Sequence, residues 1–133
     1  FSVITTLKRS IPALKKNLKN YGLYDNCVSL SSVDIPVLEL ESNLNLTEQK
    51  IEEKIKEILD NSDTEIFVLG CAGMADFAIK MKKKYNIPVI EGISVAVKFA
   101  ESFIDLDLKT SSRNSFAMPR SKKFTGIFKN FEV

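Results

Sequence analysis

The 133-residue sequence contains no histidine and no tryptophan, and it has only two cysteines, Cys27 and Cys71. Without histidine, the chain can form no Ser-His-Asp triad, no Cys-His pair and no histidine-ligated zinc site. Two isolated cysteines are also too few for a four-thiolate zinc site. We therefore expect no metal site, and any proton transfer by this chain must use Cys, Asp, Glu, Lys or Tyr.

Long apolar runs are missing as well. The longest mainly apolar stretches, 66–69 and 93–97, are far shorter than the roughly 20 residues of a membrane-spanning helix. The first residues also lack the charged-then-apolar layout of a signal peptide. For this lysine-rich chain we therefore expect a cytoplasmic location, no membrane partner and no disulfide between the two cysteines.

Neither sign of charge dominates, since 19 basic residues face 17 acidic ones. Only the segment from Lys109 onward is clearly basic, and it lacks the regular aromatic interleaving of a nucleic-acid platform. We expect no nucleic-acid partner. A solvated face is the simplest interpretation of this segment, and a substrate-closing tail, a docking tail or an anionic ligand site are the alternatives.

The start of the chain is unusual. It begins with Phe1 instead of Met and enters a strand-like run at once. We therefore expect the sequence to be a fragment, or a chain whose first part was removed. Its length predicts one domain with a single core.

Strand patterns alternate with helix patterns four times along the sequence. The best strands are continuous apolar runs, which is typical of a parallel sheet buried on both faces. The sequence thus predicts an α/β fold, a parallel sheet flanked by helices. The predicted strands are 1–5, 27–33, 65–69 and 87–90, with 37–40 as either an edge strand or part of a long loop.

Helices are predicted after each of these strands. Ser10 with Pro12 starts the first helix, an Asn45–Glu48 capping box starts the second, and Gly92 opens the last. Apolar residues at helical spacing define the faces that we expect to be buried: Leu14, Leu18 and Tyr21; Ile51, Ile55, Ile58 and Leu59; Met74, Phe77, Ala78, Met81 and Tyr85; Val95, Ala96, Phe99, Ala100 and Phe103.

Ligands of open parallel sheets bind beyond the carboxyl ends of the strands. This rule selects four segments, 5–6, 31–34, 70–74 and 91–94, and Cys71 is the best reactive residue among them. It follows a strand and precedes a helix, whose positive end stabilises a thiolate. The alternative is a small buried thiol at a tight turn. Cys27 lies within a predicted strand, and we expect it to be a core residue.

Other residues of these segments are candidates for substrate binding. Thr5 and Thr6 end the first strand, where their hydroxyls and amides can hold a ligand carboxylate or amide, although a helix-entry cap is an equal alternative. Gly70 and Gly73 flank Cys71 and Ala72, and they let the chain turn tightly and a ligand approach the amides. The turn has neither the dinucleotide-binding spacing nor that of a phosphate-binding Walker loop.

Five segments of the sequence resemble the hydantoin/allantoin racemases of the aspartate/glutamate racemase superfamily. The strongest is Val68-Leu-Gly-Cys-Ala-Gly-Met74, which is specific in this context. The resemblance covers almost the whole chain. The other matching segments are FSVITTLKRS at 1–10, IPVIEG at 87–92 with the following VAVK helix, TSSRNSFA at 110–117 and KFTG at 123–126.

The resemblance implies two similar Rossmann- or flavodoxin-like halves that face each other across a small substrate, a hydantoin, allantoin or amino-acid derivative. Each half supplies one cysteine for cofactor-independent racemisation, without PLP, metal or nucleotide. The second family cysteine falls on Cys71, and the first belongs to a segment before Phe1. By this comparison 1–92 form the α/β domain with that cysteine, whereas 93–133 form a helix and tail that pack on the absent first half.

The resemblance leaves the exact activity open. An arylmalonate decarboxylase has a single cysteine at the position of Cys71, and a two-cysteine amino-acid racemase is another relative of similar pattern. A non-catalytic binding module with a flavodoxin-like sheet is the alternative from a different class. We expect the isolated chain to be inactive unless a partner supplies the other cysteine, and a homo-oligomer stays open.

Overall fold

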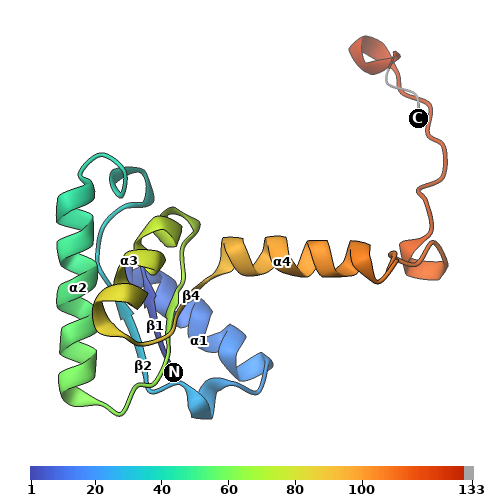
Figure 1. Ribbon diagram of the computed structural model, residues 1–133. Coiled ribbons are helices and arrows are strands. Elements are labelled where there is room, and N and C mark those ends of the chain that lie inside the picture. The colour runs from blue at the N-terminus through green and yellow to red at the C-terminus, as the bar shows by residue number, and fades with distance from the viewer. Residues whose placement is uncertain (131–133) are drawn as a thin grey trace. The chain divides into compact units, whose positions relative to one another are not determined.

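The computed structural model describes residues 1–130 (Figure 1). The chain divides into two compact units, Phe1–Phe99 and Ala100–Val133. The first unit contains the sheet. The described part of the second unit begins within helix α4 (Gly92–Asp105). It continues through 3₁₀ turns at Asn114–Phe116 and Gly126–Phe128, and its residues are exposed.

Four strands form a parallel sheet in residues 1–130: β1 (Ser2–Thr5), β2 (Ser29–Ser32), β3 (Phe67–Leu69) and β4 (Val89–Glu91). Their order is β2-β1-β3-β4, and every neighbouring pair is parallel. This confirms the predicted α/β class with a parallel sheet flanked by helices. The sequence order and the spatial order differ, so that β1 and β3, whose paired residues are 65 positions apart in the chain, lie side by side in the centre.

The helices are α1 (Ile11–Asn20), α2 (Leu44–Asn61), α3 (Ala75–Tyr85) and α4 (Gly92–Asp105). The predicted start of the last helix at Gly92 is confirmed. The α1 helix begins after Ser10 with Pro12 in its first turn, as predicted, but the Ser10 side chain makes no capping hydrogen bond.

Two local predictions were wrong, and one open alternative is decided. The cap of α2 is Asn43, whose Oδ1 accepts a hydrogen bond from the Leu46 amide at 3.1 Å, and Asn45 lies inside the helix. The segment 37–40 belongs to the loop and not to an edge strand, with Val37–Glu39 in a 3₁₀ turn after Pro36. Cys27 precedes β2 and is only partly buried.

One face of the sheet carries the main core. Ile4, Phe67 and Leu69 point from β1 and β3 toward α2 and α3, and all three are essentially inaccessible to solvent. The predicted apolar face of α2 is confirmed at Ile51, Ile55 and Ile58, with Leu59 at its margin, and that of α3 at Phe77, Ala78 and Met81. Exposed ion pairs also join the two helices, Lys80 to Glu48 at 2.5 Å and Lys84 to Glu52.

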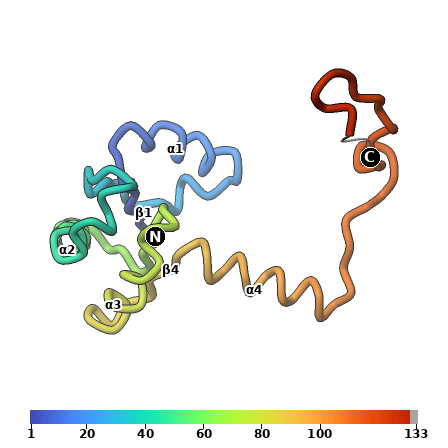
Figure 2. Tube along the Cα trace, turned by 90° about the horizontal axis from the view of Figure 1, so that it is seen from above, coloured from blue at the N-terminus to red at the C-terminus, as the bar shows by residue number. Residues whose placement is uncertain are grey.

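The opposite face of the sheet carries a row of apolar side chains. Strand register places Leu30, Val3, Val68 and Ile90 side by side across β2, β1, β3 and β4. Helix α1 lies on this side, whereas α2 and α3 lie on the other (Figure 2). Its predicted apolar stripe is only half-buried at Leu14 and Leu18, and Tyr21 is 72% exposed, so the prediction that Tyr21 is buried was wrong.

The turn after β3 and the loop before α2 pack against each other through Leu40 and Gly73. Leu40 is completely buried, and its carbonyl accepts a hydrogen bond of 2.9 Å from the buried Thr47 hydroxyl. A Cβ atom added to Gly73 would lie 2.9 Å from Leu40 Cδ1, closer than real Cβ contacts. Gly73 is therefore needed for space at this position.

Helix α4 starts directly at the end of β4, without a connecting loop. Glu91 is buried, and its two carboxylate oxygens accept hydrogen bonds from the amides of Ile93 at 2.7 Å and Ser94 at 2.9 Å. Hydrogen bonds from Ser94 lower the pKa of the Glu91 carboxyl, although burial acts in the opposite direction. None of the side chains of α4 is buried, so the expectation of a buried face at Val95, Ala96, Phe99, Ala100 and Phe103 is not met in this chain.

We predict that Gly73→Ala lowers the free energy of unfolding by about 1 to 3 kcal/mol, because the new methyl group collides with Leu40. Urea titration followed by circular dichroism measures the change. Gly92→Ala is the matched control, since nothing lies within 4 Å of a Cβ atom there. The double variant Gly73→Ala/Leu40→Ala should cost less than the sum of the two single changes, and strict additivity would contradict the proposed collision.

We also predict that Glu91→Gln loosens the start of α4 at neutral pH. Because folding lowers the Glu91 pKa, the carboxylate stabilises the folded state above its unfolded pKa, and this contribution disappears as the pH falls through the folded pKa. Hydrogen-exchange protection of the Ile93 and Ser94 amides should therefore drop in the variant at pH 7. The difference from the parent should disappear as the pH falls through the lowered pKa of Glu91 in the folded protein. The exposed Glu65→Gln is the control, and equal protection in all three proteins would refute the cap.

Candidate functional site

Cys71 lies in an accessible turn at the carboxyl end of β3. Gly70 and Ala72 on either side of it are exposed, while the Cys71 side chain is partly buried against the core. Cys71 itself is extended, with φ −143° and ψ 136°, and its carbonyl accepts a hydrogen bond of 3.0 Å from the Met74 amide. It therefore stands immediately before a helical run that comprises the 3₁₀ turn Ala72–Met74 and α3.

The thiol of Cys71 lies near the start of this helical run. The first N–H groups of a helix have no acceptor within the helix, and they carry its positive partial charge. Ala72 and Gly73 supply these groups, and a Cβ atom at Gly73 would lie 4.0 Å from Cys71 Sγ. A turn of this kind offers hydrogen-bond donors to an anionic group that binds next to the sulfur.

Thr5 and Thr6 reach the same edge of the sheet from β1. The Gly70 amide donates a hydrogen bond of 2.8 Å to the Ile4 carbonyl, and a Cβ atom at Gly70 would lie 3.6 Å from Thr5 Cβ. Both threonines are buried, and their carbonyls accept hydrogen bonds from the amides of Val33 and Ile35. The structure thus brings together all six predicted site residues, Thr5, Thr6, Gly70, Cys71, Ala72 and Gly73.

Two further residues shape this edge. Leu40 packs against Gly73 and holds the turn in place, and the sequence pattern alone did not identify it. Leu40 is one of three apolar residues between Pro36 and Asn43, with Val37 and Leu38, and the sequence pattern does not distinguish it from them. The segment 91–94 also follows a strand and was therefore predicted as a possible ligand-binding segment. Its one carboxylate, that of Glu91, caps α4.

The other cysteine lies elsewhere. Cys27 precedes β2, at the amino edge of the parallel sheet, whereas Cys71 follows β3 at the carboxyl edge. The Cys27 thiol donates a hydrogen bond of 3.4 Å to the Ser29 carbonyl. Burial raises the pKa of the Cys27 thiol, and the nearby amino terminus lowers it to a smaller extent. This environment favours the protonated form.

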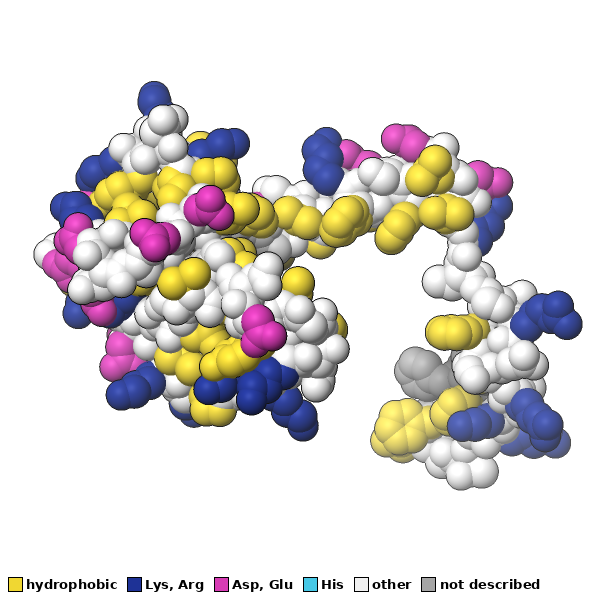
Figure 3. Space-filling view, turned by 90° about the horizontal axis from the view of Figure 1, so that it is seen from below, with side chains coloured by type: hydrophobic (Ala, Val, Ile, Leu, Met, Phe, Trp, Pro, Cys, Tyr) yellow, Lys and Arg dark blue, Asp and Glu magenta, His cyan; other side chains and the backbone are white. Residues whose placement is uncertain are grey.

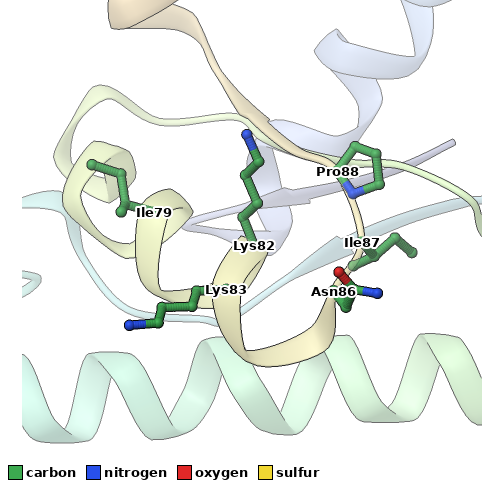
Figure 4. A pocket seen from close by; sticks show the side chains of 6 residues that line it. All are labelled: Ile79, Lys82, Lys83, Asn86, Ile87 and Pro88. Carbon is green, nitrogen blue, oxygen red and sulfur yellow. The ribbon is translucent and has the colours of Figure 1, made fainter.

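A surface pocket of about 620 Å³ also lies at the amino edge of the sheet (Figure 4). Asn86, Ile87 and Pro88 line it just before β4, and the Lys82 and Lys83 side chains point in different directions around it. It contains none of the predicted site residues. Within residues 1–130, the acidic and cysteine side chains form no cluster suited to a metal ion, and no helix is long and apolar enough to cross a membrane.

Comparisons with known proteins agree with the fold and the motifs. The family described as Asp/Glu/Hydantoin racemase matches residues 1–100. The chain is 37% identical to a hydantoin racemase of Rhizobium meliloti, over 95% of this chain and 52% of that protein. It is 33% identical to a hydantoin racemase of a Pseudomonas species (strain NS671), over 98% of this chain and 53% of that protein.

Solved structures give the same result. The allantoin racemase of Klebsiella pneumoniae matches with a TM-score of 0.85 and 37% identity, over 98% of this chain and 53% of that one. The allantoin racemase of Pseudomonas fluorescens matches with a TM-score of 0.77 and 36% identity. The chain spans about half the length of these relatives. Since the family match extends over most of its residues, the chain belongs to the Asp/Glu/hydantoin racemase family.

Proposed function

We propose that this chain forms one half of the active site of a cofactor-independent racemase of the hydantoin or allantoin type, an isomerase in which Cys71 is the acid/base residue. The observation that carries the proposal is the position of Cys71: an accessible turn, directly before a helical run, at the edge where β1 also ends. The length of the match to racemases supports it.

The chemistry required by this reaction fits the residues of the turn. The α-proton of a hydantoin is acidified by the adjacent carbonyl, so its removal leaves an enolate that needs N–H donors. A thiolate at Cys71 would take that proton, or a thiol there would deliver one to the planar intermediate. The amides of Ala72 and Gly73 would stabilise the enolate oxygen, Gly70 would let the substrate approach the turn closely, and Thr5 and Thr6 would hold polar groups of the substrate. No step calls for a metal, PLP or a nucleotide.

Inversion needs a second acid/base group on the opposite face of the α-carbon. Cys27 does not serve, because it lies at the other edge of the sheet and keeps its proton. We therefore assign the second thiol to a half that faces residues 1–92, and residues 93–133 to contacts with that half. The half-length match to the racemases supports this division.

We predict that Cys71→Ser lowers racemisation by about 10² to 10⁴-fold, the usual contribution of a positioned acid/base group. The test protein is a chimera in which this chain replaces the matching part of the Rhizobium meliloti hydantoin racemase. Loss of optical rotation of an enantiopure 5-substituted hydantoin, and of allantoin, measures the rate. The variant should keep the circular dichroism spectrum of the parent chimera.

Cys27→Ser is the matched control, since it removes the other sulfur and should leave the rate within about two- to three-fold of the parent. Full activity of the Cys71→Ser chimera would refute the proposed role. Decarboxylation of an arylmalonate by the parent chimera, without racemisation of either substrate, would instead support the single-cysteine decarboxylase.

A further inference from the structure

We propose that a second copy of this chain covers the open part of its sheet, through reciprocal docking of helix α4. The docking surface, called here the sheet groove, is an apolar hollow of about 460 Å³ between α1 and the sheet. Six of its lining residues carry the argument: Val3, Leu14, Leu18, Leu23, Val68 and Ile90. The inference does not depend on the catalytic role of Cys71.

The sheet groove exists because this face of the sheet has only one helix within the described residues. Parallel sheets are normally covered by helices on both faces. Helix α1 covers the β2 side of the apolar row, while the row continues over β3 and β4 at Val68 and Ile90, and Ile90 is 40% exposed. The open space therefore has the position of a second helix that lies beside α1.

Helix α4 has the surface that fits such a space. At 100° per residue, the apolar side chains occupy a broad arc, whereas Ser94, Lys98, Glu101, Ser102 and Asp105 share the remaining arc. Figure 3 shows the apolar side chains gathered along one side of this helix. Phe99 is 61% exposed and Ile104 is 78% exposed. With 14 residues the helix is about 21 Å long, similar to the width of four strands.

The start of α4, Gly92–Phe99, belongs to the same unit as the sheet, and its residues are exposed. Five residues separate β3 from α3, and a similar loop precedes α1, which lets these helices turn back over the strands. By contrast, Glu91 ends β4 and Gly92 begins α4, and a strand-to-helix reversal normally needs at least two loop residues. The Glu91 carboxylate fixes the first turn of α4 in addition.

A second copy is the occupant that these surfaces favour. The apolar helix and the apolar groove belong to the same chain, so one two-fold arrangement covers both surfaces in both copies. The formal net charge of +2 opposes such pairing only weakly.

Analytical ultracentrifugation of the 133-residue chain tests the inference, and we expect a dimer at about 100 µM. Phe99→Asp on α4 and Ile90→Glu in the groove should each raise the dissociation constant of the dimer by more than about 30-fold, since each substitution buries a charge in the interface. Both positions are exposed in the single chain, so the fold should persist by circular dichroism. Leu38→Glu is the matched control, because Leu38 is 92% exposed and lies outside both surfaces.

Photo-cross-linking identifies the contact itself. A benzophenone amino acid at position 99, in an equimolar mixture of ¹⁵N-labelled and unlabelled chains, should give mixed-label cross-links to residues 11–23 or 64–70. A monomer at the concentration stated above, a dimer that tolerates Ile90→Glu, or same-label cross-links only would overturn the inference. So would binding of the amino-terminal half of the Rhizobium meliloti racemase without any self-association. Cys71→Ser should still dimerise, which separates this inference from the proposed catalysis.

Discussion

The parallel pairing of β1 with β3 is the constraint on which the rest of the structure depends. It joins residues that are 65 positions apart in the chain, with Ile4 opposite Leu69, and so places Thr5 beside Gly70, next to Cys71. The same pairing aligns Ile4, Phe67 and Leu69 toward α2 and α3, and the apolar row toward α1. The core and the candidate site are therefore two results of one strand register, because a shift by one residue would exchange the two faces.

Sequence patterns predicted the class of the fold and the candidate site because both depend on local signals. Continuous apolar runs identified the strands, and the rule that ligands bind at carboxyl ends selected the turns after them. Thr5 and Cys71 meet at one edge for this reason, although nothing in the spacing of the sequence gives their distance. The motif around Cys71 then gave the family, which the match over residues 1–100 bears out.

Features that depend on distant contacts were not predictable in this way. Asn43 and Asn45 are both good caps, and tertiary packing of the loop through Leu40 and Thr47 selects the first. The exposure of Tyr21 follows from the absence of a second helix beside α1, which a local apolar stripe cannot reveal. The apolar run that contains Cys27 resembles a strand. However, Tyr24–Asn26 form a 3₁₀ turn whose Asn26 carbonyl accepts a hydrogen bond from the amino terminus, and β2 begins only at Ser29.

Helix α4 follows β4 without a connecting loop, and it carries exposed apolar side chains. The apolar hollow between α1 and the sheet includes Val68 and Ile90. Exposed apolar surfaces of this extent are characteristic of interaction sites. The same segment holds Glu91 in a capping role, which fixes the direction of the helix at the edge that carries the candidate site. Under the proposed function, a second α/β half would both cover these apolar surfaces and supply the second acid/base group.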